Sequence, residues 1–267
     1  MNHNNNDMTD NELKELLDEK FEEYNTQAFI DNDPICVPHL FTKKEDIEIA
    51  GFFAAMLAWG QRPQIIRSAT KLMQMMDNEP YNFITAATRN DLDQFGKFVH
   101  RTFDGEDCRF FIRSLRNIYL KHHGLEQVFT AAYKQHHDIG PAITAFRKAF
   151  YAITHFPRSE KHVSSPVKNS ACKRINLFLR WMVRNDGRGV DFGLWKEIPA
   201  SKLYCPLDVH TGNTSRELGL LKIKLNNWKA VEELTGTLRK FDPNDPVKYD
   251  FSLFGLGINN KISKFDV

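Results

Sequence analysis

Hydrophobic positions recur at helical spacing along most of this chain, and the strict alternation typical of half-buried strands is weak throughout. Ile65, Ala69, Leu72 and Met76 form one apolar stripe of this kind, which ends before Pro80. Helices are predicted over residues 64–76, 107–123, 125–136, 141–153, 170–184, 208–219, around 228–238 and over 245–254. The pattern therefore predicts an all-α fold.

The segment from Thr42 to Trp59 is the most apolar of the predicted helices. Thr42 and Glu45 have the spacing of a capping box that opens a helix, and Gly60 can end it. Apolar residues surround this helix on all sides instead of forming one stripe. We therefore expect it in the middle of the fold.

A long polar loop divides the chain. Residues 155–169 contain two prolines and mixed charges, which favour a loop. We therefore expect two helical lobes, at about 35–155 and 156–267, with a cleft between them and with interleaving of their elements left open. Residues 1–34 form a separate acidic segment, expected to be partly helical or disordered.

Composition is that of an ordinary globular protein, with 42% hydrophobic and 26% charged residues in a chain of 267. No apolar run approaches the ~20 residues needed to span a bilayer, and the first residues lack the pattern of a signal peptide. We expect a monomer in the cytoplasm, associated with the nucleoid and not with a membrane. Four cysteines without C-x-x-C spacing, and histidines without chelating spacing, predict no metal site.

Charge is unevenly distributed, although the net charge is only +2. Residues 1–34 contain ten acids and two lysines, or −8, which leaves +10 for the rest of the chain. Residues 168–190 contain six bases and one acid, or +5. A concentrated positive field suits a polyanion such as nucleic acid, and a solvated helix face explains the same charges equally well.

Two residues at predicted helix starts could carry chemistry. Asp208 stands at an N-cap position, where backbone N–H groups and the helix dipole favour the ionised carboxylate. Such a group can stabilise an oxocarbenium ion at a sugar carbon. Lys173 lies in the first turn of its helix and is a potential amine nucleophile that forms a Schiff base. Taken singly, an ordinary cap and a solvated or phosphate-binding lysine are the simpler explanations.

Aromatic side chains near these residues could hold a base. Phe178 and Trp181 lie on the helix that begins near Lys173, and bases stack on such rings. The same positions also fit an ordinary core stripe. Trp59, Gln61 and Arg62 end the central helix with groups that could enter a duplex.

The sequence around Asp208 resembles a known signature. Leu207-Asp-Val-His-Thr-Gly-Asn-Thr-Ser-Arg-Glu-Leu-Gly-Leu220 is similar to the V-D-T-H-V-x-R-V-x-x-R-L-G motif of the helix-hairpin-helix DNA glycosylases, the superfamily of endonuclease III and 8-oxoguanine glycosylase. Ala54–Gln61 resembles the early L-L-S-x-Q helix of that superfamily. The whole chain also resembles a bacterial family of proteins of unknown function, the DUF2400-like proteins, through the strings CKRxNxFLRWMVR and FDPxDPVKYDFxLFGLG.

The chain departs from the glycosylase pattern at the hairpin. The usual L-P-G-V-G-x-K-T-A is replaced by residues 163–173, which contain no glycine. Lys173 and Asp208 are 208 − 173 = 35 residues apart, a spacing that resembles the archaeal 8-oxoguanine glycosylases. The C-terminal cysteine cluster is absent, so neither an iron–sulfur cluster nor another cofactor is expected.

The resemblance implies a two-lobed glycosylase-like fold that flips a damaged base out of double-stranded DNA, with an oxidised purine as one candidate. It implies Lys173 as the nucleophile and Asp208 as the carboxylate that stabilises charge. The expected DNA contacts are Gln61, Arg62, Lys168, Ser170, Arg174, Arg180 and His210, and the expected base pocket is Trp59, Phe178 and Trp181. The alternatives are a catalytically silent DNA-binding module and a scaffold for another nucleic-acid or nucleotide substrate.

Overall fold

The computed structural model describes the backbone of residues 8–262 and the side chains up to residue 257. It is predominantly helical, which confirms the all-α prediction; strands β1 (Val99–His100) and β2 (Phe103–Asp104) form one short antiparallel hairpin. The α-helices are α1 (Asp10–Tyr24), α2 (Gln27–Ile30), α3 (Lys44–Leu57), α4 (Arg62–Met75), α5 (Pro80–Ala86), α6 (Arg89–Asp93), α7 (Gly105–His122), α8 (Leu125–His136), α9 (Ile139–Phe150), α10 (Lys173–Val183), α11 (Val209–Glu217), α12 (Trp228–Phe241) and α13 (Tyr249–Ile262). Short 3-10 helices are η1 (Pro34–Cys36), η2 (Pro38–Leu40), η3 (Gln94–Lys97), η4 (Pro157–His162), η5 (Ala200–Lys202) and η6 (Pro246–Lys248).

Helix α3 is the buried central helix that its all-round hydrophobicity predicts. Every residue from Asp46 to Leu57 is buried. The predicted capping box at Thr42 is wrong, because the N-cap is Lys43 and Glu45 therefore lies one position too early to complete the box. The carboxylate of Asp46 instead accepts a hydrogen bond of 2.8 Å from the backbone N–H of Tyr81, which ties α3 to α5.

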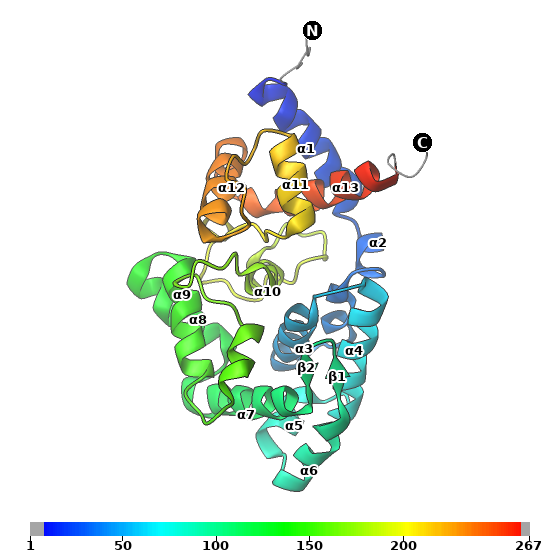
Figure 1. The fold of residues 1–267 in the computed structure, drawn as a ribbon, viewed down its shortest axis with the longest axis vertical. Coiled ribbons are helices and arrows are strands. Elements are labelled where there is room, and N and C mark those ends of the chain that lie inside the picture. The colour runs from blue at the N-terminus through cyan, green and yellow to red at the C-terminus, as the bar shows by residue number, and fades with distance from the viewer. Residues whose placement is uncertain (1–7, 263–267) are drawn as a thin grey trace.

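Helix α10 crosses α3 near the middle of the molecule (Figure 1). Gly51 permits the close approach, since a Cβ there would lie 3.0 Å from the methyl carbon of Met182. Phe178 of α10 packs edge-on against Phe52 and Trp195, with ring centroids 5.6 and 5.4 Å away. Aromatic burial therefore fixes α10 against the core on one side.

Two buried arginines fix the other side of α10. Arg184 donates to Asp191 at 3.0 Å and to Asp245 at 2.8 Å, and it also pairs with Asp186. Arg180 pairs with Asp191 and Asp250. Because both guanidinium groups are almost fully buried, each needs these carboxylates to replace water. The network therefore joins α10 to the following loop, to the residue before η6 and to α13.

The described part of the acidic N-terminal segment, residues 8–34, packs onto the C-terminal part of the chain. Helix α1 lies along α13, and its buried face of Leu13, Leu17 and Phe21 belongs to the main hydrophobic core (Figure 1). Acidic side chains of α1 also form ion pairs with the rest of the chain, and Glu22 lies 2.6 Å from Arg188. Figure 1 shows α1, α11, α12 and α13 grouped at one end of the molecule and α3 to α7 towards the other, with α10 between them and α8 and α9 to one side of α10.

We expect Arg184→Met to lower the free energy of unfolding by about 3–5 kcal/mol, because it leaves buried carboxylates without their cation. Arg188→Met is the matched control: it removes an exposed pair with Glu22 and only a longer contact of 3.8 Å with Asp186, so its loss should be about 1 kcal/mol or less. Urea unfolding followed by circular dichroism measures both. Equal losses in the two variants would show that the buried network contributes no more than a surface pair.

Candidate active site

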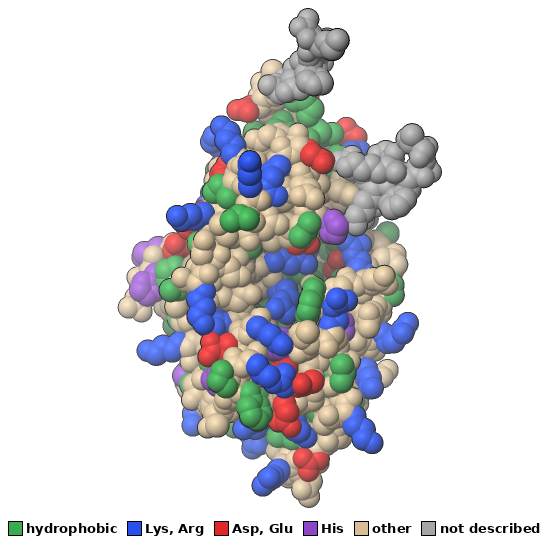
Figure 2. Space-filling view, in the orientation of Figure 1, with side chains coloured by type: hydrophobic (Ala, Val, Ile, Leu, Met, Phe, Trp, Pro, Cys, Tyr) green, Lys and Arg blue, Asp and Glu red, His purple; other side chains and the backbone are tan. Residues whose placement is uncertain are grey.

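One face of the molecule is hollowed by a pocket of about 850 Å³. Figure 2 shows this hollow, with Lys and Arg side chains gathered in it and around its edge. Its walls come from η1, the residues after α3, the start of α4, the end of η4, α10, the start of α11 and α13. The volume lies within the range of ~300–1,000 Å³ typical of small-molecule sites.

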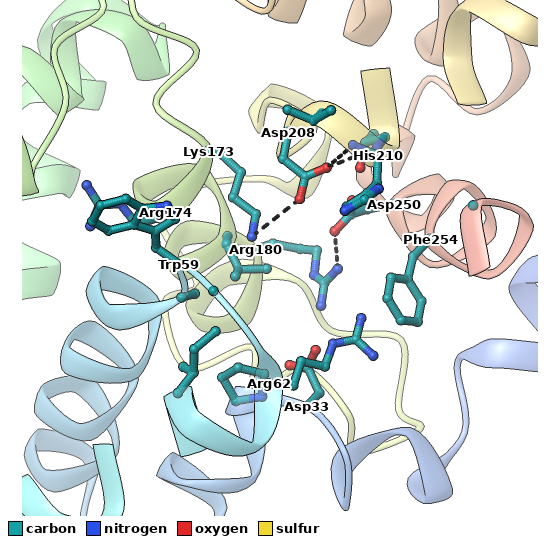
Figure 3. Close-up of a pocket in the computed structure, with 18 of the residues that line it drawn as sticks. Asp33, Trp59, Arg62, Lys173, Arg174, Arg180, Asp208, His210, Asp250 and Phe254 are labelled. Carbon is teal, nitrogen blue, oxygen red and sulfur yellow. Dashed lines mark hydrogen bonds and ion pairs between the residues drawn. The ribbon is translucent and has the colours of Figure 1, made fainter. Parts of the chain in front are cut away.

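Lys173 and Asp208 meet in this pocket. The Lys173 amine lies 3.7 Å from the Oδ2 atom of Asp208, and the two side chains are 29% and 36% exposed (Figure 3). Lys173 is the first residue of α10 and Asp208 is the N-cap of α11. The structure therefore brings together the two helix starts that the sequence singled out.

The carboxylate of Asp208 is held in one direction. Its Oδ1 atom accepts from the backbone N–H groups of His210 and Thr211, at 2.8 and 3.0 Å. Burial alone would raise the pKa of Asp208, but the Lys173 charge and these N–H groups outweigh it and hold the pKa below its usual range. Asp208 is therefore an oriented anion at neutral pH.

A second layer positions the backbone of Asp208. The side-chain amide of Asn226 donates to the Asp208 carbonyl at 2.8 Å, and Arg216 donates to the other end of that amide at 2.6 Å. Gly212 makes room for this contact, because a Cβ there would lie 2.6 Å from the Asn226 Oδ1 atom. The glycine in the Asp208 motif is thus explained by packing at the start of α11.

Across the pocket from Asp208, charged and aromatic groups line a second region (Figure 3). The guanidinium of Arg62 lies over the Phe254 ring, 4.0 Å from its centroid. Burial raises the pKa of Asp250 to about 6, although Arg180 opposes the shift. Burial also raises the pKa of Asp33, whose Oδ1 atom accepts from the Ile35 N–H at 3.1 Å. Three carboxylates and several cations therefore face one space.

The turn before α10 forms without glycine. Asn169 and Cys172 adopt left-handed backbone conformations, with φ of 55° and 52°. Asn tolerates this conformation better than most residues, so it supplies what a glycine would. The predicted N-cap at Ser170 is wrong, because the helix begins at Lys173 with Cys172 as N-cap, and Ser170 instead forms a β-bridge with Asn227.

Several expected site residues lie elsewhere or have other partners. Phe178 and Trp181 are 0% exposed and lie in the core, so the proposed base pocket keeps only Trp59, which is 46% exposed at the pocket wall. Phe178 packs against Phe52 of α3 and against Trp195, and Trp181 is fully buried, so neither ring can stack on a base. Gln61 is exposed beside the lining residues Gly60 and Arg62.

The basic run at 168–190 is not a surface patch. Arg180 and Arg184 are buried in ion pairs, and Arg188 pairs with Glu22. Arg174 lines the pocket but donates to the backbone carbonyls of Met56 and Lys161, at 2.5 and 3.2 Å. Lys168 is exposed outside the lining, 3.6 Å from Glu160, whereas the exposed His210 does line the pocket. Much of the predicted positive charge therefore has internal partners.

Sequence reasoning missed Asp33, Asp250 and Phe254. Asp33 precedes Pro34 and has the appearance of an ordinary cap, and nothing local links it to α10. Asp250 and Phe254 are one helical turn apart on α13, which was a weak signal that they share a face. It also missed His162, a pocket-wall residue that contacts the buried Asp107 at 2.9 Å.

Comparison with known proteins gives one match. A family model described as "Protein of unknown function (DUF2400)" matches residues 33–259, most of the chain. No curated protein and no solved structure matches it. Within residues 8–262, none of the helices combines the length and the apolar character that crossing a membrane requires.

The carboxyl group of Asp250 should titrate with a midpoint near 6 in the folded protein, because burial disfavours its charged form. Between the ordinary value of 3.8 and this value, the folded state holds a proton that the unfolded state has lost. The contribution of Asp250 to the free energy of unfolding therefore falls as pH rises from about 4 to about 6. Carbon-13 NMR of the carboxyl group, assigned with Asp250→Asn, measures the midpoint; a value near 4 would contradict the prediction.

Proposed function

The chain belongs to the DUF2400 family of proteins of unknown function, and we propose from its pocket that it is a DNA glycosylase with an associated lyase step. The observation that carries the proposal is the contact of Lys173 with Asp208 at 3.7 Å, in a pocket large enough for a nucleobase. An amine and an ionised carboxylate at one sugar carbon are the groups that covalent base removal needs. The resemblance around Asp208 supports the same assignment.

The reaction would proceed at the anomeric carbon of a flipped nucleotide. The N-glycosidic bond breaks, the base leaves with the electron pair and takes up a proton, and Asp208 stabilises the oxocarbenium charge. The neutral amine of Lys173 then bonds to C1′. The bonded nitrogen then loses a proton. The C1′–O4′ bond opens and O4′ takes up a proton, which leaves a Schiff base between Lys173 and C1′. Removal of a C2′ proton expels the 3′ phosphate with its electron pair and cleaves the strand.

Several groups at the pocket edge support the proposal of a DNA partner. Trp59 is exposed there, with the Arg101 guanidinium 4.7 Å from its ring centroid. Lys161 is exposed at the pocket wall. We propose that damaged double-stranded DNA lies over this edge, and that the helices on either side of α10 act as the two lobes of a glycosylase-like cleft. Cations and an exposed aromatic ring suit phosphates and an unstacked base step.

We expect borohydride to trap a covalent adduct between the protein and an abasic duplex. The Schiff base is reduced to a stable amine only if Lys173 has bonded to C1′. Lys173→Gln should abolish the adduct. Asp208→Asn should slow adduct formation by about 10²- to 10⁴-fold on a duplex that still carries its damaged base, where the oxocarbenium charge must form, and much less on the abasic duplex. Denaturing gel electrophoresis of labelled duplexes carrying an abasic site, 8-oxoguanine or other lesions measures the yield.

Lys161→Gln is the matched control, since it removes a pocket cation that forms no covalent bond. It should weaken binding and leave the adduct. An adduct that survives Lys173→Gln would sink the assignment of this lysine, and no adduct across the lesion panel would sink the proposed chemistry.

A second candidate is a catalytically silent DNA-binding module, and the Lys173–Asp208 ion pair itself favours it. At 3.7 Å the carboxylate stabilises the charged ammonium, which binds phosphate but does not attack carbon. This candidate predicts duplex binding that weakens with salt and yields no product. Asp208→Asn should then leave the dissociation constant within about twofold, as measured by fluorescence anisotropy at several salt concentrations.

A further inference from the structure

The region of the pocket across from Asp208 holds donors and acceptors that the sugar chemistry does not use. Arg62, Asp33 and Asp250 all line it, and Figure 3 shows them around one open space beside Phe254. Each comes from a different element: α4, the residue before η1, and α13. Three separate segments thus converge on a polar site with an aromatic wall.

Arg62 offers hydrogen bonds that nothing else takes up. Its guanidinium stacks on Phe254 at 4.0 Å, yet its N–H donors have no acceptor among the described residues. Arg62 is also partly buried. Because Arg62 lines the pocket, its free donors are available to a ligand atom there that accepts hydrogen bonds.

Asp33 and Asp250 each offer one free acceptor. The Oδ1 atom of Asp33 accepts from Ile35, and the Oδ2 atom of Asp250 pairs with Arg180. The other oxygen of each carboxylate has no donor among the described residues. Asp250 is only 8% exposed, so its remaining oxygen can be satisfied only from the pocket.

We propose that this region reads the Watson–Crick edge of a guanine-type base, with Arg62 donating to O6 and the two carboxylates accepting from N1–H and the 2-amino group. The inference rests on the proposed function for how the base arrives, by flipping out of DNA. The Phe254 ring supports the Arg62 guanidinium from one side, 4.0 Å from the ring centroid, and so helps to hold its donors in place.

Other bases fit this set of groups less well. Adenine presents an amino donor where Arg62 needs an acceptor, and its N1 lone pair would face a carboxylate. Uracil and thymine have one N–H between two carbonyls, so one carbonyl would meet a carboxylate. Hypoxanthine lacks the amino group. Guanine and its 8-oxidised form carry the same O6, N1–H and 2-amino groups on this edge. The region therefore recognises guanine as a base type and does not distinguish the oxidised form from the unmodified one.

Binding of deoxynucleosides tests the inference without any catalysis. In NMR titrations, deoxyguanosine and 8-oxo-deoxyguanosine should bind about 10- to 100-fold more tightly than deoxyadenosine, with deoxyinosine between them. Asp33→Asn should lower the guanine-to-adenine ratio of affinities by at least about tenfold, because its amide presents a donor in place of an acceptor. The amide can still cap Ile35, so the variant should fold.

Asp31→Asn is the matched control, because Asp31 is exposed and lies outside the pocket lining. It should leave the ratio unchanged. Equal binding of all four nucleosides, or an equal loss for all of them in Asp33→Asn, would overturn the inference.

The two hypotheses fail separately. An adduct with an abasic duplex needs no base in the pocket. Trapping without guanine preference would therefore refute only the proposal that this region recognises guanine. Guanine preference without an adduct on any duplex would refute the glycosylase and leave a site for a guanine-containing ligand.

Discussion

The architecture of this protein depends on the buried ion network that holds α10. Arg180 and Arg184 are withdrawn from water, and their carboxylate partners come from the loop at 191 and from the residues around η6 and α13. Removing a buried charge from water costs several kcal/mol unless its partners are in place. The C-terminal helices therefore have one arrangement relative to α10 that satisfies both arginines. That arrangement also fixes where α13 faces the pocket.

The same helix joins the buried ion network to the candidate site. Lys173 opens α10, and Arg180, two turns later, reaches Asp250 on the pocket wall. Asp208 is set from the other side by its own helix cap and by the Asn226–Arg216 pair. Because each group is held by elements packed on the core, their 3.7 Å contact does not depend on a surface loop.

Local features of the fold could be predicted from sequence, and long-range ones could not. The helix over 125–136 and the cap at Asp208 follow from spacing and from one side chain, so both were predicted correctly. The basic run at 168–190 was misjudged because the acids that neutralise Arg180 and Arg184 include Asp245 and Asp250, far along the chain. Phe178 fitted a core stripe better than a base platform from its spacing alone, and the position of α3 decides for the core. Asp33 enters the pocket through the path of η1, which no local pattern encodes.

The state of Asp208 constrains the order of the proposed reaction. Its pKa is held below the usual range, so it is a poor acceptor for the ammonium proton of Lys173. The departing base, in contrast, leaves with an electron pair and gains basicity as the glycosidic bond lengthens. The proton is therefore better transferred from Lys173 to the base, while Asp208 stays ionised beside the oxocarbenium carbon. In the proposed reaction the Lys173–Asp208 pair would thus serve first as a proton donor and a fixed anion, and the amine would attack only after the glycosidic bond has begun to break.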